Sequence, residues 1–355
     1  MSVLRRCLAL LAAALLAGCA SEPLVMQLEA PAANGMRLFP PPQTQEVPRY
    51  RYLGQLTGEN NFKPKDPENR GTGRKLLAWI AGLGEETQRP VVLQRPQSGM
   101  VDATGRVLVT DVSRNAVFVF DEPGGKLDVW DRATRTTRFE APIGIAPGPA
   151  GQILVTDADL GRVFRLAPDG APLGEFGAGL LRRPTGIVRD AQRGRIYVAD
   201  THAHDVKIFD DGGRLVATWG QRGTAPGELN YPTHLWLTEG MLLVADSMNA
   251  RVQGFDSEGK PVLRFGERGL YVGNMVRPKG VAADDEGNLY VVESMHDTLL
   301  VFDREARLLM SLGGSDNDGG RFFLPAGVWV DARNRVFVAD MFNGRVAVFQ
   351  FLGGN

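Results

Sequence analysis

The chain has 355 residues, of which 43% are hydrophobic and 23% are charged, an ordinary balance for a globular protein. Its formal net charge is -1 and its acidic and basic residues are interspersed, so we expect no nucleic-acid partner. The 43 glycines and 22 prolines indicate frequent turns, which favours many short strands over long helices.

The N-terminus has the pattern of an export signal. Arg5 and Arg6 precede an apolar stretch, Leu8 to Ala17, that is too short to span a bilayer. Leu16-Ala17-Gly18-Cys19 resembles the bacterial lipobox, and the resemblance implies a signal peptide over residues 1–18 and lipidation of Cys19. The alternative is an ordinary secretory signal with an incidental cysteine. Because the other cysteine, Cys7, lies in the leader, we expect no disulfide.

The residues after Cys19 bear on where the protein resides. Ala20 and Ser21, without an Asp, resemble the pattern of lipoproteins sorted to the outer membrane. This predicts a lipid-anchored protein of the cell envelope, on the periplasmic or the surface side. Residues 19–48 are rich in Pro, Ala and Gln and predict a flexible tether, with one domain over residues 49–355.

Two elements are predicted between this tether and the repeats that follow. Tyr50 to Gly58 has the composition of a β-strand but belongs to no copy of the repeat. Lys75 to Leu83 has the apolar spacing of an amphipathic helix, which predicts a short helical insert over about 74–84. That helix either packs over one face of the body or docks a partner.

The rest of the chain consists of six copies of one repeat. Each copy opens with a proline that a small or special residue follows within three positions. The opening prolines are 46, 42, 48, 46 and 47 residues apart: Pro96, Pro142, Pro184, Pro232, Pro278 and Pro325. This period is typical of propeller blades.

Each copy predicts four short strands. An apolar run, a polar turn and a β-branched run ending in an acid come first, as in Ile196 to Asp200. The acid recurs in all copies, at Asp111, Asp157, Asp200, Asp246, Glu293 and Asp340. The sixth copy stops after its third strand, so Tyr50–Gly58 is expected to complete it and to leave no exposed edge. We therefore predict an all-β, six-bladed β-propeller with four-stranded blades.

The repeat closely resembles the NHL family of propellers. Its signature is a Pro-x-Gly-Val opening, a Val-Ala-Asp strand end and Asn-x-Arg-Val. The best matches are the fourth copy, Val244 to Val252, and the sixth, Val338 to Val346, whereas Ala116, Asp205 and Thr298 replace Arg in three other copies. Since NHL propellers include binding platforms and enzymes, the resemblance implies a fold but no single function.

Features that recur in several blades are interpreted as scaffold. The strand-end acid is expected to accept hydrogen bonds from loop amides and to tie neighbouring blades. Trp236 and Trp329 stand at the same position, four residues after the opening proline of their copies, and are expected to pack between blades.

All four histidines depart from the repeat. His202 and His204 follow the second strand of the third copy, His296 follows that of the fifth, and His234 replaces an opening glycine in the fourth. We expect these positions to approach one mouth of the central channel. Imidazoles there could bind zinc or calcium, with His234 and His296 as the first candidates; the similar peptide-amidating lyases bind zinc through histidines. The alternative is a rim of hydrogen-bonded histidines.

No serine-nucleophile motif, phosphate loop or Cys-x-x-Cys is present, so the catalytic residues remain unknown. The sequence favours a non-enzymatic, monomeric binding or scaffold module for a protein, peptide or glycan; the alternative is a metal-dependent lyase or hydrolase. The candidate binding rim consists of His202, His204, Tyr231, His234, Asn249, Arg251, Met295, His296, Phe342, Asn343 and Arg345.

Overall fold

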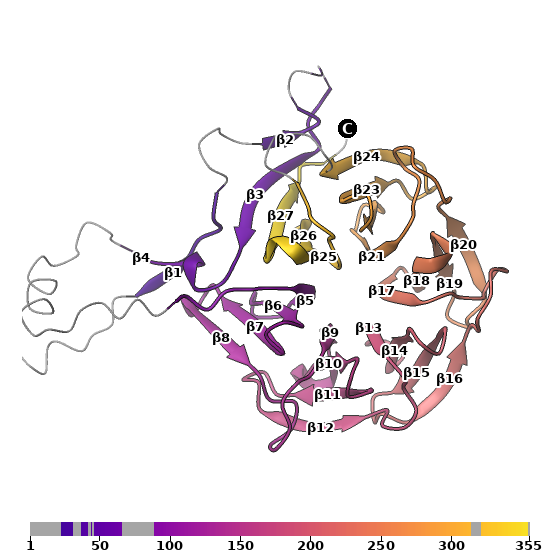
Figure 1. Ribbon diagram of the computed structural model, residues 1–355, viewed down its shortest axis with the longest axis horizontal. Coiled ribbons are helices and arrows are strands. Elements are labelled where there is room, and N and C mark those ends of the chain that lie inside the picture. The colour runs from indigo at the N-terminus through magenta and orange to yellow at the C-terminus, as the bar shows by residue number, and fades with distance from the viewer. Residues whose placement is uncertain are drawn as a thin grey trace, which may run out of the picture.

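A computed structural model describes residues 23–30, 37–41, 44, 46–65, 89–313 and 321–353. In these ranges six antiparallel sheets stand around a central axis and form a six-bladed β-propeller (Figure 1). The predicted fold class is therefore confirmed. No helix in the described ranges is long and apolar enough to cross a membrane.

Blades 1 to 5 each contain four consecutive strands, which follow one another from the innermost to the outermost. Blade 1 has β5 (Pro96–Val101), β6 (Val107–Asp111), β7 (Ala116–Asp121) and β8 (Lys126–Trp130). Blade 2 has β9 (Pro142–Pro147), β10 (Ile153–Asp157), β11 (Arg162–Leu166) and β12 (Pro172–Phe176). Blade 3 has β13 (Pro184–Asp190), β14 (Arg195–Asp200), β15 (Asp205–Asp210) and β16 (Leu215–Trp219).

Blade 4 has β17 (Pro232–Thr238), β18 (Met241–Asp246), β19 (Arg251–Phe255) and β20 (Pro261–Phe265). Blade 5 has β21 (Pro278–Ala283), β22 (Leu289–Glu293), β23 (Thr298–Phe302) and β24 (Leu308–Gly313). Blade 6 begins with β25 (Val328–Val330), β26 (Arg335–Asp340) and β27 (Arg345–Phe351). Short 3-10 turns occur at Glu59–Asn61, Pro149–Gly151, Ser247–Asn249 and Met341–Asn343.

The core lies between neighbouring blades, and the pattern of apolar residues in a strand depends on the position of that strand within its blade. Second strands are buried on both faces, as in β6, where all five residues are buried. Outer strands such as β20 alternate partly buried and exposed residues, as expected for a sheet with one wet face. Phe118 of blade 1 and Phe337 of blade 6 belong to one apolar cluster, which shows how adjacent blades share their side chains.

The N-terminal strand closes the ring. β3 (Tyr50–Leu56) pairs antiparallel with β27, with Leu56 opposite Val346 and Tyr50 opposite Phe351. This confirms the predicted closing strand, although its described pairing ends at Leu56 rather than Gly58. A further strand, β2 (Arg37–Phe39), pairs with β3, so the sixth sheet has five strands.

The recurring strand-end acids hold loop backbone in place. In blade 1 the buried Asp111 carboxylate accepts hydrogen bonds from the Gln94 and Arg95 amides at 2.6 and 2.8 Å. It also accepts the Ser113 and Arg114 amides from the loop after its own strand. Because buried amides without partners are costly, this carboxylate fixes two loops at once, as predicted for a scaffold residue.

Direct bonds between blades come from hydroxyl groups beside these acids. Thr110 donates to the Ile143 carbonyl of blade 2 at 2.6 Å, and Thr201 donates to the Pro232 carbonyl of blade 4 at 2.6 Å. At the closure the Tyr50 and Tyr290 hydroxyls lie 3.1 Å apart, and Tyr290 donates to the buried Asp284 carboxylate at 2.7 Å. The closing strand is thus bonded to blade 5 as well as to blade 6.

Part of the expected tether pairs with the propeller, which corrects the prediction that residues 19–48 stand free of it. β1 (Leu24–Met26) pairs with β4 (Phe62–Pro64), and Glu29 forms a backbone bridge with Gln55. Thr57 donates to the Glu29 carboxylate at 2.8 Å, which holds the segment by its side chain too. The polar composition of this segment predicted a tether, but backbone groups of β3 and β4 are available to pair with it. Residues 1–22 with Cys19, and the predicted helix at about 74–84, lie outside the described residues.

The tyrosine contact at the closure leads to a first prediction. Tyr290→Phe removes a buried hydroxyl that bonds both Tyr50 and Asp284, so we expect the free energy of unfolding to fall by about 1–3 kcal/mol. Chemical denaturation measures this. Tyr271→Phe is the matched control, because Tyr271 is 84% exposed. Equal stability of the two variants would contradict a role of this network in ring closure.

A second prediction tests the docking of the N-terminal segment. A side chain at Gly125 would overlap the Leu24 carbonyl oxygen, whereas one at Gly105 meets nothing within 4 Å, and both residues have positive φ (61° and 87°). Gly125→Ala should therefore speed hydrogen exchange in residues 23–30, and Gly105→Ala should not. Equal exchange rates in the two variants would mean that the segment does not pack against this turn.

Candidate functional site

The loops fall on two distinct faces of the ring. In blades 1 to 5 the first residue of the inner strand lies opposite the last residue of the second strand, as for Pro96 with Asp111 and Pro278 with Glu293. The loops before inner strands and those between second and third strands therefore share one face, which we call the loop face. The turns between first and second strands and between third and fourth strands form the opposite face, which we call the turn face.

His202, His204 and Tyr231 form one cluster on the loop face. The Tyr231 ring stands edge-on to His204 at 4.6 Å and to His202 at 5.9 Å between centroids. The Tyr231 amide donates to Nδ1 of His204 at 3.2 Å, and burial lowers the pKa of that imidazole. His204 has a φ of 61°, but Asn115 has a φ of 52° at the corresponding place in blade 1, so this conformation belongs to the loop type.

Two pairs of the predicted rim residues bond the strand-end acids and loop carbonyls. Arg251 is 6% exposed, and its guanidinium donates to Asp246 at 2.7 Å and to the carbonyls of Thr224, Ala225 and Glu228. Asn249 donates to Asp246 as well. Asn343 and Arg345 repeat this arrangement around Asp340 in blade 6, with Asn343 exposed. The arginines hold loop carbonyls in place, and Arg251 is too buried to meet a partner.

Met295, His296 and Phe342 remain available on the rim. Met295 and His296 line a shallow cavity of about 430 Å³ together with Phe323 and Asn343. Phe342 is 47% exposed and contacts Phe323, with ring centroids 5.2 Å apart. This part of the loop face spans blades 5 and 6.

A further apolar segment, in the loop between blades 4 and 5, belongs to none of the motifs of the repeat and was not predicted. Leu270, Tyr271 and Val272 are 86%, 84% and 74% exposed. Arg268 of the same loop donates to the Met248 carbonyl at 2.8 Å, which links this loop to the rim of blade 4. Three consecutive apolar residues between Gly269 and Gly273 were the signal in the sequence.

The turn face differs sharply from the loop face. Its turns are built from aspartates that accept backbone amides, and several pair with a basic residue four positions on, such as Asp102 with Arg106 and Asp331 with Arg335. Among the described residues, none of the turns between first and second or between third and fourth strands carries a strongly exposed large apolar side chain. The apolar loop residues gather on one side of the ring.

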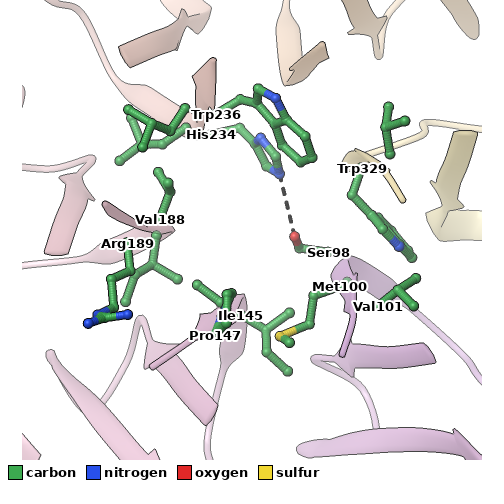
Figure 2. Close-up of a pocket in the computed structure, with 16 residues that line it drawn as sticks. Ser98, Met100, Val101, Ile145, Pro147, Val188, Arg189, His234, Trp236 and Trp329 are labelled. Atoms are coloured by element: carbon green, nitrogen blue, oxygen red, sulfur yellow. Dashed lines mark hydrogen bonds between the residues drawn. The ribbon is translucent and has the colours of Figure 1, made fainter. Parts of the chain in front are cut away.

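His234 lies inside the central channel, which corrects its placement on the rim. Its Nε2 is 3.4 Å from the Ser98 hydroxyl (Figure 2). Its Nδ1 is 3.1 Å from the Val281 carbonyl oxygen. Burial lowers the pKa of His234 to about 4, so the imidazole is neutral at physiological pH. His234 is the third residue of the inner strand β17, and its side chain points toward the channel. The repeat pattern in the sequence did not show in which direction this side chain points.

Trp236 and Trp329 also face the channel, although both were expected to pack between blades. Together with Ser98, His234, Met100 and Val188 they line a cavity of about 300 Å³ (Figure 2). Both also pack between blades as predicted: Trp329 stacks on Phe337 of its own blade at 5.4 Å and shares one apolar cluster with Phe118 of blade 1, and Trp236 packs against the clusters of neighbouring blades. Side chains alternate between the two faces of a strand, and this alternation predicted contacts with neighbouring blades. On an innermost strand, however, one edge of a large ring also reaches the central channel.

The four histidines do not assemble a metal centre. No group of three or more His, Cys, Asp or Glu side chains in the described part of the chain could hold a metal ion. The histidines lie in three separate places. His202 and His204 contact Tyr231, and His234 contacts Ser98 and Val281. His296 lines a cavity together with Arg321 and Phe322. The geometry therefore does not fit zinc or calcium at His234 and His296.

Comparisons with known proteins identify the repeat and the fold. Residues 181–209 match the family model of the NHL repeat. The match lies on the third copy, whereas the fourth and sixth were expected to fit best. No curated protein sequence matches the chain. As many as 1247 chains of solved structures match, so the fold is widespread and does not by itself select a function.

Solved structures with this fold have diverse roles. Virginiamycin B lyase from Staphylococcus aureus is 14% identical, with a TM-score of 0.54 over 73% of this chain and 96% of its own. A gluconolactonase from Xanthomonas campestris is 16% identical, with a TM-score of 0.55 over 74% and 89%. An auxiliary nutrient binding protein from Bacteroides ovatus is 15% identical, with a TM-score of 0.57 over 72% and 69%. These likenesses concern the fold alone, and the chain is a six-bladed β-propeller of which residues 181–209 match the NHL repeat.

Proposed function

We propose that this propeller is a non-enzymatic binding module that docks a protein partner through its loop face. The observation that carries the proposal is the asymmetry between the two faces of the ring. Large apolar side chains are exposed on loops of blades 4 to 6, at Met248, Leu270, Tyr271, Val272, Met295, Phe323 and Phe342. The opposite turns present aspartates and arginines.

The chemistry of the loop face favours a protein over a glycan. Aromatic, methionine and arginine side chains are enriched in protein interfaces, and this patch combines Tyr271 and Phe342 with Met295. The Arg95 guanidinium lies 5.4 Å from the centroid of the Phe342 ring, which adds a cation beside an exposed aromatic. Aliphatic residues at the tip of the blade 4 to 5 loop offer a sugar few hydrogen bonds.

The fold is compatible with such a role. One chain of similar fold comes from a nidogen/laminin complex, with 20% identity and a TM-score of 0.51, and another is an auxiliary nutrient binding protein. Neither identifies the partner of this chain. They support the inference only in that this architecture occurs in proteins that bind others or bind nutrients.

We place this binding module at the cell envelope, anchored through Cys19. The support is the sequence Leu16-Ala17-Gly18-Cys19 directly after an apolar stretch. The lack of an Asp at positions 20 and 21 favours the outer membrane. The pairing of residues 24–26 and the Glu29 bridge leave few residues between the lipid and the body, so the propeller would stand close to the membrane surface.

The docking proposal predicts a loss of partner contact when the exposed loop is made polar. A photoreactive amino acid at position 295, in the full chain in its own cells, should give a defined protein adduct. Leu270→Ser, Tyr271→Ser and Val272→Ser together should reduce this adduct at least tenfold, because exposed apolar anchors carry much of the binding energy of an interface. Immunoblots of the crosslinked envelope measure the adduct.

Two controls belong to this experiment. Leu173→Ser changes a 54% exposed residue on the outer strand β12 and should leave the adduct intact. The photoreactive group at Glu258, on the turn face, should not give the same adduct. An adduct that survives the triple change, or that forms equally from position 258, would overturn docking through the loop face.

The anchor is tested separately. Cys19→Ser should abolish labelling by an alkyne fatty acid and release the protein from the membrane fraction, since the thiol is the acylated group. Cys7→Ser is the matched control and should keep both the fatty-acid labelling and the membrane association, because Cys7 lies within the predicted leader. Persistent labelling of Cys19→Ser would show that the chain is not a lipoprotein of this type.

A further inference from the structure

The central channel is divided by two side chains at one layer of the ring. The third residue of the repeat is glycine in four copies, Gly144, Gly186, Gly280 and Gly327. These glycines allow neighbouring inner strands to approach; a side chain at Gly186 would come within 2.7 Å of the His234 backbone. Ser98 and His234 occupy the same layer in blades 1 and 4, and they meet across the channel. Together they form the inner end of the cavity.

The next layer explains why a cavity remains beyond this pair. Here blades 4 and 6 contribute Trp236 and Trp329, whereas blades 2 and 3 contribute the smaller Ala146 and Val188. Two flat rings therefore stand across from short side chains (Figure 2). The lining continues to the strand ends at Pro147 and Val330, so the cavity lies on the turn-face side of the channel.

The polar atoms of the cavity carry no net charge. Arg189 lies at the cavity wall, but its guanidinium makes two hydrogen bonds of 2.7 Å with the Asp211 carboxylate. The lining includes no carboxylate. Nδ1 of His234 is closest to the Val281 carbonyl oxygen, which favours a proton on Nδ1 and leaves Nε2 as an acceptor.

One buried donor in the wall lacks a partner. Trp329 is 2% exposed, and its indole Nε1 has no hydrogen-bond partner among the described residues. A buried N–H without an acceptor costs about 1–3 kcal/mol, so such groups are rare in native proteins unless something else accepts the bond. Nε1 has almost no accessible surface, however, so this N–H faces the packed wall between blades 6 and 1 rather than the cavity, and the Trp329 ring offers the cavity apolar atoms only.

We infer that this cavity binds a small uncharged molecule with a flat, largely apolar body and one polar end. The apolar body would lie between the two tryptophans and the short side chains of blades 2 and 3. The polar end would lie at Ser98 and His234, whose hydroxyl and Nε2 are the polar side-chain atoms at the inner end of the cavity. A volume of about 300 Å³ is at the small end of ligand pockets. This site is distinct from the loop face and does not depend on partner docking.

Paired probes test the inference on the full chain. 2-Naphthamide and 2-naphthoate have nearly the same shape, but only the second is an anion. On ¹⁵N-labelled protein, 2-naphthamide should shift the indole N–H signal of Trp329, assigned with Trp329→Phe, in a saturable way. 2-Naphthoate should bind at least tenfold more weakly, because the cavity offers an anion no unpaired cation. Equal binding of both probes, or no shift with either, would overturn the inference.

Filling the cavity provides the second readout. Val188→Trp places in blade 3 the residue that blades 4 and 6 carry at this layer, and it should weaken 2-naphthamide binding at least tenfold. Val216→Trp, on the outer strand of the same blade, should leave binding unchanged. Thermal melting of both variants checks that they fold. Unchanged binding to a folded Val188→Trp protein would place the probe elsewhere and refute the site.

Discussion

The ring closes where β3, from the N-terminal part of the chain, pairs along β27 and so completes the last blade. The pairing occupies backbone groups that would otherwise be free to bind other chains. It also places Tyr50 against Tyr290, so that the closing strand is bonded to the blade before the last. The positions of all six inner strands, and thus of the channel, depend on this closure.

Within the closed ring, the inner strands approach so closely that most blades tolerate only glycine at the third position. Departures from glycine at Ser98 and His234 therefore have a definite spatial result: they fill the channel at one layer. The tryptophans of blades 4 and 6, opposite smaller residues, then leave a cavity next to that layer. These side chains shape the cavity, and burial lowers the pKa of the histidine that lines it, so that the imidazole is neutral at physiological pH.

The two faces of the ring differ because their connections differ. Tight hairpin turns need aspartate to accept backbone amides and glycine to adopt positive φ, which leaves little room for apolar side chains. The longer connections between blades have no such requirement, and one of them exposes Leu270, Tyr271 and Val272. A partner-binding surface on the loop face and a small-molecule cavity toward the turn face can therefore coexist without sharing residues.

The sequence alone determined the six blades, their four strands and the closing strand, because these follow from local periodicity repeated along the chain. It also identified the strand-end acids as scaffold, since a residue that recurs in every blade is expected to have the same structural role in each. Only the tertiary structure decided which of the residues that were singled out in the sequence are exposed to solvent. His234 and Trp329 lie in the channel, Arg251 is buried among loop carbonyls, and residues 24–26 pair with the body. Burial and neighbours depend on contacts between distant segments, and no local pattern encodes them.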